Sequence, residues 1–245
     1  MNILETKNLT KRFGGLIAVN KVNFGLKKGE RRGIIGPNGA GKTTFFNLLS
    51  GYYRPSEGKI FFQGEDITNL KPFQRSRIGI SRTFQLTNVF FDMTVFENVW
   101  VGANSRAKHP LKFFSSAKKA TEIAEKAKEI CEMLGLGDKL HELAGNLSGG
   151  DQRLLEVAIG LSTDPVVLLL DEPTSGLSPK ESVDLIKTLS ALPKELSIVL
   201  IEHNIDAVFD FSRTITVLHE GSIIAEGPPE KIRKNKKVKQ VYLGE

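Results

Sequence analysis

The chain has 245 residues, a formal net charge of +6, 40% hydrophobic residues and 25% charged residues. This length and composition suit a globular protein with one large domain, or a core with a subdomain, and a sizeable apolar interior. No apolar run approaches the roughly 18 residues of a membrane-spanning helix, the first residues lack the pattern of a secretory signal, and the single cysteine, Cys131, excludes an internal disulfide and fits a reducing cytoplasm.

Residues 1–85 have the pattern of short strands joined by tight turns. The strands are expected at residues 3–9, 18–24, 31–35 and 59–63, and Gly29, Gly58 and Gly64 mark turns at their ends.

The third of these strands leads into Gly36-Pro-Asn-Gly-Ala-Gly-Lys-Thr43, which has the form G-x-x-x-x-G-K-[ST]. A helix is expected from residue 44 to 49, and strand, loop and helix in this order are the context that the phosphate-binding motif requires. Glycines let consecutive N–H groups point at phosphate oxygens, and the helix N-terminus adds a favourable dipole. A plain glycine-rich turn is the alternative, and the context disfavours it. The pattern therefore predicts a nucleoside triphosphate site made by Gly36, Pro37, Asn38, Gly39, Ala40, Gly41, Lys42, Thr43 and Thr44.

Two side chains of this motif carry its chemistry. Lys42 is expected to bridge the β- and γ-phosphates, and the hydroxyl of Thr43 is expected to ligate Mg²⁺.

Residues 86–164 are expected to be mainly helical. Within 117–134, apolar residues recur at the spacing of one helix face. They are Ile123, Ala127, Ile130, Cys131 and Leu134.

Leu147-Ser-Gly-Gly-Asp-Gln152 precedes a helix that is expected from residue 153 to 161. Ser148 is a candidate N-cap for this helix, and Gly149 and Gly150 would permit the turn. The same three residues can also bind an anion through free N–H groups and a hydroxyl. Both interpretations stay open. The anion-binding interpretation requires a second source of phosphate, besides the nucleotide expected at residues 36–44.

Two apolar runs, residues 166–170 and 197–201, are typical of parallel strands that are covered on both faces. A helix is expected between them, from residue 179 to 192. The first run ends at Asp171 and Glu172, which brings two carboxylates to the sheet edge where ligands of α/β proteins bind. Asp171 is placed to hold Mg²⁺ and Glu172 to act as general base. Without the phosphate loop, a turn that caps a helix would be the simpler interpretation.

Basic residues gather near the end of the chain. They are Lys231, Arg233, Lys234, Lys236, Lys237 and Lys239. Such a run attracts anionic membranes or nucleic acid, but a solvated helical end is the interpretation that we favour. No aromatic residues interleave the run to stack on bases, so we expect no nucleic-acid partner.

Six motifs in fixed order resemble the ATP-binding subunits of ABC transporters, over essentially the whole chain. They lie at residues 36–43, 83–85, 147–152, 170–173, 175–178 and 202–203. The resemblance implies an α/β fold, the P-loop NTPase core of the ABC ATPase type, with an antiparallel β subdomain and a helical subdomain. The whole chain, 1–245, would be one ABC ATPase domain, with core and β subdomain in 1–85 and 165–245 and the helical signature subdomain in 86–164.

The resemblance also implies roles for single residues. Two such domains pair head to tail, so that Ser148, Gly149 and Gly150 of one complete the phosphate site of the other. Gln85 would touch Mg²⁺ and the attacking water and would link the core to the membrane partner. His203 would be the switch histidine that reaches the γ-phosphate, although a histidine at a strand end is more often structural. Phe13 would stack on adenine, with a place in the core as an equal alternative.

Two positions depart from the family's pattern. Asp151 stands where the signature usually has glutamine, and its carboxylate would face away or bind a cation or a backbone N–H. Ser178 stands where the family often has aspartate, which leaves the contact across the dimer open.

Finer features are similar to the ATPases of branched-chain amino-acid importers. They are Arg82-Thr-Phe-Gln85, Met93-Thr-Val-Phe-Glu-Asn98, Gly64-Glu-Asp-Ile-Thr68 and residues 224–227 and 241–245. This similarity implies an ATPase that uses ATP and Mg²⁺ at the cytoplasmic face of the cell membrane. Its partners would be a second ABC ATPase subunit, transmembrane permease subunits and, indirectly, a substrate-binding protein. A urea or amide importer, a lipid exporter and a soluble assembly complex are alternative settings.

Overall fold

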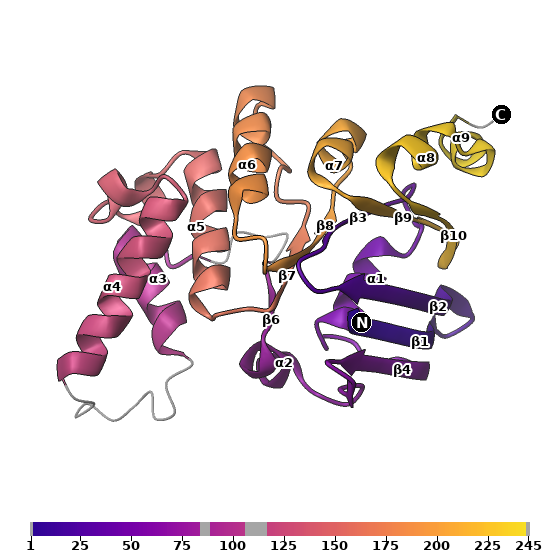
Figure 1. Ribbon diagram of the computed structural model, residues 1–245, viewed down its shortest axis with the longest axis horizontal. Helices are drawn as coiled ribbons and strands as arrows, with labels where there is room; N and C mark the ends of the chain where they lie inside the picture. Colours follow the sequence, from indigo (N-terminus) through magenta and orange to yellow (C-terminus); the bar gives the residue numbers. More distant parts are fainter. Residues whose placement is uncertain (1, 84–88, 106–116, 244–245) are drawn as a thin grey trace.

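Two β-sheets form the body of the protein, and the computed structural model describes residues 2–83, 89–105 and 117–243 (Figure 1). Within these residues the larger sheet has the order β10-β9-β3-β8-β7-β6, and all its strands are parallel except β10. Its strands are β3 (Arg31–Ile35), β6 (Ile80–Arg82), β7 (Val167–Asp171), β8 (Ser197–Ile201), β9 (Thr214–His219) and β10 (Ser222–Gly227). The smaller sheet is antiparallel, in the order β2-β1-β4-β5. Its strands are β1 (Asn2–Phe13), β2 (Leu16–Lys27), β4 (Glu57–Phe62) and β5 (Glu65–Asp66).

The centre of the larger sheet is covered on both faces. Every residue of β3, β7 and β8 is buried, and successive residues alternate between two apolar clusters. Leu168, Leu170 and Leu200 pack on the helical side, whereas Leu169 and Val199 pack toward the smaller sheet. The near-continuous apolar runs of β7 and β8 are therefore buried on both faces of the sheet, as the sequence predicts.

The carboxyl ends of β3, β7 and β8 lie level at one edge of the sheet. Ile34 and Asp171 both pair with Ile201. The strand that is expected at 166–170 is in fact β7, which begins one residue later and includes Asp171. This carboxylate is therefore fixed by the ladder, because it belongs to the strand itself.

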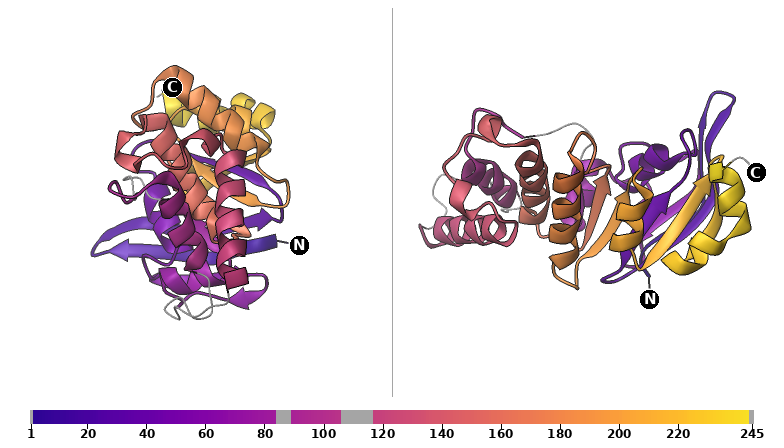
Figure 2. Two further views of the ribbon diagram at one scale, coloured as in Figure 1. Left: turned by 90° about the vertical axis from the view of Figure 1, so that its left-hand side faces the viewer. Right: turned by 90° about the horizontal axis from the view of Figure 1, so that it is seen from above.

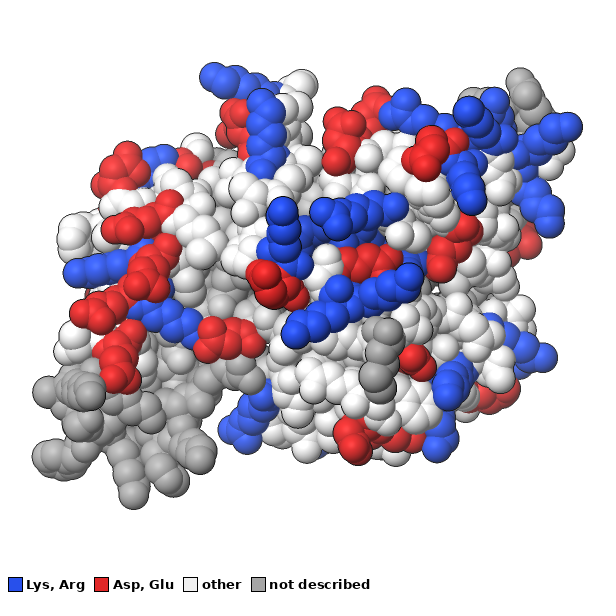
Figure 3. Space-filling view, in the orientation of Figure 1, with Lys and Arg blue, Asp and Glu red and all other residues white. Residues whose placement is uncertain are grey.

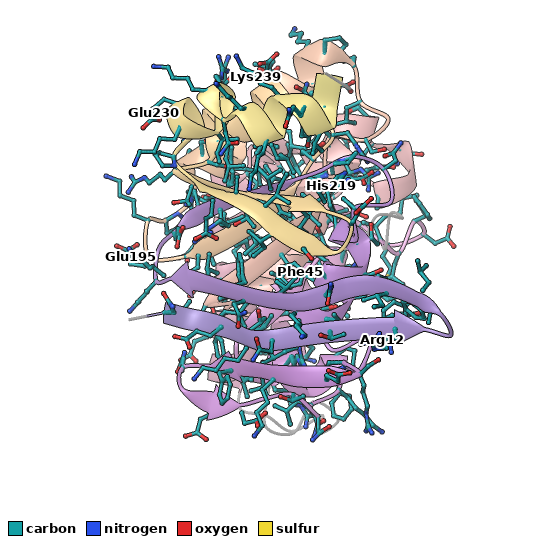
Figure 4. The ribbon with its side chains drawn as sticks, turned by 90° about the vertical axis from the view of Figure 1, so that its right-hand side faces the viewer. Arg12, Phe45, Glu195, His219, Glu230 and Lys239 are labelled. Carbon is teal, nitrogen blue, oxygen red and sulfur yellow. The ribbon has the colours of Figure 1, made fainter. Side chains whose placement is uncertain are left out.

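Helix α1 (Lys42–Leu49) lies between the two sheets (Figure 4). Phe45 and Phe46 are fully buried, and the ring of Phe45 meets that of Phe24 edge-on, with centroids 5.4 Å apart. Burying one such side chain stabilises the fold by roughly 1.5–3 kcal/mol. Packing from both sides fixes α1, and with it the loop that precedes it.

Three helices form a group at one end of the molecule (Figures 1 and 2). They are α3 (Val95–Asn104), α4 (Ala117–Met133) and α5 (Gly149–Ser162). The predicted apolar face is buried at Ala127, Ile130, Cys131 and Leu134, whereas Ile123 is partly exposed. This group shares one apolar cluster with β7, β8 and α6 (Pro179–Ala191).

The remaining helices pack around the sheets. They are α2 (Pro72–Ile78), α7 (Ile205–Phe211), α8 (Pro229–Lys234) and α9 (Lys236–Leu243). The basic residues of α8 and α9 are exposed and gather at one corner of the surface (Figure 3), while Ile232 and Val238 of these helices are buried. This is the pattern of a solvated helical end. None of the described helices combines the length and the apolar character needed to span a bilayer.

Candidate active site

The loop between β3 and α1 presses against two other segments. A side-chain carbon at Gly36 would lie 2.3 Å from the carbonyl oxygen of Leu218, and one at Gly41 would lie 2.2 Å from that of Ala18. Gly41 also has a φ of 95°, in the left-handed region that favours glycine. The curl of the loop therefore requires glycine at both of its ends.

Lys42, the first residue of α1, is buried and folds back over this loop. Its Nζ donates hydrogen bonds to the carbonyl oxygens of Gly36 (2.7 Å) and Pro37 (3.1 Å). Burial lowers the pKa of Lys42, and the charges of Glu172 and Asp171 act in the opposite direction. The ammonium group is thus held by neutral carbonyl oxygens. A charged phosphate oxygen would bind it more strongly than these carbonyl oxygens do.

Glu172 and His203 meet beside this loop. His203 Nε2 lies 2.9 Å from Glu172 Oε1, and the side chains of His203 and Glu172 are 53% and 11% exposed. The backbone N–H of Glu172 donates to the carbonyl oxygen of Ile201 at 2.9 Å, which extends the ladder one residue past β7. Glu172 has a φ of 52°, and for a residue with a side chain this costs on the order of 1 kcal/mol. The hydrogen bond to Ile201 holds the backbone of Glu172 in this strained conformation and so fixes where its carboxylate lies.

The two oxygens of Asp171 differ in their surroundings. Oδ2 accepts a hydrogen bond from Arg82 Nη2 at 2.7 Å, whereas Oδ1 is buried and has no hydrogen-bond partner among the described residues. Burial raises the pKa of Asp171, and Arg82 opposes this rise. A buried carboxylate oxygen of this kind requires a water or a cation.

These residues fit Mg²⁺. A carboxylate oxygen of Asp171 and the hydroxyl of Thr43 are hard oxygen ligands of the kind that this ion prefers. In the part of the chain that the structure describes, no three His, Cys, Asp or Glu side chains form a metal-binding group. Phosphate oxygens of a nucleotide and water would therefore supply the other ligands, as is usual for Mg²⁺.

Two charged residues without a role assigned from the sequence hold the surroundings of these carboxylates. Arg82, the last residue of β6, also donates from Nη1 to Asn47 Oδ1 (2.6 Å) and thereby links Asp171 to α1. Glu202 is 4% exposed and accepts hydrogen bonds from the backbone N–H groups of Thr174 (2.7 Å) and His203 (3.2 Å). Burial raises the pKa of Glu202. The sequence shows both as charged residues next to buried strands, which could have marked them as candidates. It does not show which groups they bond, because those contacts form only in the folded chain.

A pocket of about 610 Å³ lies over the loop, a volume within the usual range of small-molecule sites. Nine of the predicted residues line it: Asn38, Gly39, Ala40, Gly41, Lys42, Thr43, Thr44, Glu172 and His203. Four further residues line it that the sequence did not single out: Leu16, Ile17, Ala18 and Glu220. Gly36, Pro37 and Asp171 are not among the lining residues.

Phe13 also lies outside the lining of the pocket. It ends β1, is 42% exposed, and meets the ring of Tyr53 edge-on with centroids 5.3 Å apart. Leu16 and Ile17, at the start of β2, supply the apolar lining instead. Stacking of Phe13 on adenine stays a prediction.

The Ser-Gly-Gly segment forms the start of α5, apart from the pocket. Ser148 is the N-cap, and its Oγ accepts a hydrogen bond from the backbone N–H of Asp151 at 3.2 Å. Ser148 and Gly149 are exposed, and neither they nor Gly150 line the pocket. The capping role is confirmed, and the anion-binding role stays a prediction.

Gln85 lies outside the described residues. The described chain reaches Thr83, whose backbone N–H donates to the carbonyl oxygen of Leu169 at 3.0 Å. Thr83 therefore lies beside β7.

Known proteins resemble the chain in sequence. The profile of the ABC transporter family matches residues 19–175, and that of the branched-chain amino acid ATP-binding cassette transporter matches residues 222–245. The whole chain is 44% identical to the probable branched-chain amino acid transport ATP-binding protein LivG of Archaeoglobus fulgidus and covers 96% of it. It is 41% identical, over 99% of its length, to the high-affinity branched-chain amino acid transport ATP-binding protein LivG of Escherichia coli, of which it covers 98%.

Solved structures show the same fold. An ATP-binding cassette of an ABC transporter in its ADP conformation has a TM-score of 0.86 and 33% identity, with full coverage of both chains. A dimeric cassette bound to ADP and Pi, in a post-hydrolysis state, has a TM-score of 0.77 and 26% identity, and the match covers 92% of this chain and 98% of that one. The predicted fold class is thereby confirmed, and the chain belongs to the ABC transporter family as a nucleotide-binding cassette that hydrolyses ATP.

Proposed function

We propose that the chain is the motor subunit of an importer for branched-chain amino acids, in which ATP binding closes two cassettes and hydrolysis reopens them. The observation that carries this proposal is the contact of Glu172 with His203 in the pocket that also contains Lys42. The substrate class has support from the names of the Archaeoglobus fulgidus and Escherichia coli relatives and from the profile match at residues 222–245.

ATP binding would rearrange the hydrogen bonds of the pocket. Lys42 would exchange the carbonyl oxygens of Gly36 and Pro37 for oxygens of the β- and γ-phosphates. Thr43, Asp171 and Gln85 would hold Mg²⁺, which would neutralise phosphate charge and orient the phosphates.

Hydrolysis would use the pair of Glu172 and His203. The imidazole of His203 faces the carboxylate of Glu172 at 2.9 Å. When a γ-phosphate arrives, His203 would turn toward it and stabilise the charge that develops there. Glu172 would then accept a proton from the attacking water as general base.

The position of the signature supports a site shared between two chains. Ser148 and Gly149 are exposed and lie outside the pocket of their own chain. In a head-to-tail pair, the Ser-Gly-Gly segment of one cassette would bind the γ-phosphate held by the other. The solved dimeric cassette supports such pairing. The second cassette would be either a second copy or a related ATPase.

The transported amino acid would cross the membrane through other proteins. Permease subunits would form the path, and a binding protein would deliver the substrate to them. The cassette would act at the inner face of the cell membrane, and we expect its contact with the permeases near Gln85.

A purification from the native host tests this proposal. Tagged Glu172→Gln, which is expected to hold ATP without turnover, is isolated in detergent with ATP, and its partners are identified by mass spectrometry. Recovery of two polytopic membrane proteins and a related ATPase is the expected result. Recovery of soluble partners alone would overturn the transport function and leave the ATPase site intact.

The substrate class has its own test in the reconstituted complex. We expect ATPase activity to rise when the binding protein carries leucine, isoleucine or valine. A rise with urea, an amide or a lipid, and none with these amino acids, would overturn the assignment to branched-chain amino acids.

A further inference from the structure

The N-terminus of α5 carries more negative charge than suits a helix end that binds a phosphate. Asp151 lies in its first turn. Glu181 of α6 approaches the same turn: its pKa is lowered first by hydrogen bonds from Ser178 and also by the N–H of Gly150, while the charge of Asp151 raises it. A like charge close to a phosphate opposes its binding. Binding a second chain's nucleotide here requires a compensating cation.

Lys139 supplies such a cation. It ends the 3-10 turn Gly137–Lys139, and its Nζ donates to Asp151 Oδ2 at 2.7 Å. The hydrogen bond with Asp151 raises the pKa of Lys139, and the charges of Asp138 and Glu142 add to this rise. The side chains of Lys139 and Asp151 are 28% and 19% exposed, so the pair is partly shielded from water.

The same carboxylate oxygen also binds the hydroxyl of the signature. Ser148 Oγ donates to Asp151 Oδ2 at 2.7 Å, and it accepts from the backbone N–H of Asp151 at 3.2 Å. A serine hydroxyl has one proton to donate. The Ser148 hydroxyl cannot donate to a phosphate oxygen while it donates to Asp151. When it turns to a phosphate, Asp151 loses this hydrogen bond. Because Lys139 donates to the same oxygen, the carboxylate stays satisfied when Ser148 turns away.

We propose that Lys139 is a positioning residue of the signature, which neutralises Asp151 and so allows Ser148 to direct its hydroxyl to the γ-phosphate of a nucleotide held by a second cassette. The proposal rests on the proposed head-to-tail pairing. It also explains how the chain accommodates aspartate where related cassettes usually have glutamine. The role of Lys139 is to act through Asp151, not to touch the nucleotide.

The test is a double-mutant cycle in the Glu172→Gln background. Lys139→Met keeps the length of the side chain and removes its charge, and Asp151→Asn removes the charge that Lys139 neutralises. The dissociation constant of the ATP-bound dimer is measured by sedimentation, nucleotide affinity of the monomer by calorimetry, and folding by thermal unfolding. Lys187→Met, at an exposed position of α6, is the matched control.

We expect Lys139→Met to weaken the ATP-bound dimer about tenfold, which is about 1.4 kcal/mol, and Asp151→Asn in the same chain to restore it to within about threefold. Lys139→Arg keeps the charge and is expected to pair normally. The nucleotide affinity of the monomer should not change, because Lys139 does not line the pocket of its own chain.

An unchanged dimer with Lys139→Met would overturn the proposal. So would an equal loss with and without Asp151→Asn, because the lysine would then act through packing. If Lys139→Met does not fold, Lys139→Arg and Asp151→Asn are measured instead. Both are expected to dimerise at least as well as Glu172→Gln alone, and weaker pairing by either variant would overturn the proposal. Failure of the reference Glu172→Gln itself to dimerise with ATP would instead overturn the proposed pairing, and this inference with it.

Discussion

The two regions of the chain that we propose to bind phosphate are built in opposite ways. The loop at residues 36–41 is locked by close backbone contacts, and the strands place Asp171 and Glu172 beside it. The start of α5 is exposed, and its Ser148 hydroxyl is bonded to Asp151 of its own chain. The described residues of the first region come together within one subunit, whereas the hydroxyl of the second is bonded within its own chain and would have to turn to reach a nucleotide. Nucleotide binding and turnover should therefore be separable by mutation.

The largest expected effect belongs to the first region. Glu172→Gln should reduce turnover on the order of 10²-fold or more, because an amide cannot accept the proton of the attacking water. ATP affinity should persist. Steady-state phosphate release and calorimetry measure the two quantities, and Glu230→Gln, an exposed position on α8, is the matched control. Near-normal hydrolysis by Glu172→Gln would remove the general base from the proposed mechanism.

A loss of binding, and not only of turnover, is expected for Lys42→Ala. Charge-assisted hydrogen bonds are each worth roughly 1.5–3 kcal/mol, so two phosphate contacts correspond to a loss of about 10²-fold in ATP affinity. Fluorescence titration with a labelled nucleotide measures it, with Lys187→Ala as control. Unchanged affinity would show that the lysine does not contact the phosphates.

A smaller effect is expected for the metal. Arg82→Lys keeps the positive charge but loses the fork that joins Asp171 to Asn47. Residues that orient a metal ligand typically change affinity 10–100-fold, and we expect about tenfold weaker binding of Mn²⁺, as a substitute for Mg²⁺, in the presence of ADP. Electron paramagnetic resonance of free Mn²⁺ gives this value directly. Equal affinity in the variant would mean that Arg82 does not position Asp171.

The smallest expected effect concerns the base of the nucleotide. An aromatic contact is worth roughly 0.5–1.5 kcal/mol, so Phe13→Leu should weaken ATP binding about threefold to tenfold if this ring stacks on adenine. Leu16→Ala tests the alternative that the apolar lining of the hairpin holds the base. If Phe13→Leu has no effect and Leu16→Ala does, the stacking prediction is wrong.

The motifs of the first region could be predicted from the sequence because they are local. Residues 36–43 adopt their loop through glycines and a helix start within eight positions, and the apolar run 197–201 coincides with β8. The approach of Glu172 to His203 also follows from features that the sequence shows, because both residues follow strands that end at the same edge.

The remaining features of the site depend on tertiary contacts. Leu16 and Ile17 line the pocket because the β1–β2 hairpin lies against the loop and β10, which strand periodicity cannot reveal. The partner of Asp151 lies twelve residues earlier, in a 3-10 turn without a repeating pattern. Arg82 and Asp171 are 89 residues apart and meet only because β6 adds to the edge of β7.

The most direct test of the contrast between the two regions is Ser148→Arg in the Glu172→Gln background, with sedimentation and nucleotide binding measured on the same protein. We predict that the variant binds ATP as tightly as Glu172→Gln alone but stays monomeric, because the signature serves only the nucleotide of a second cassette. A normal ATP-bound dimer, or a loss of ATP binding by the monomer, would contradict the division of the site between two chains.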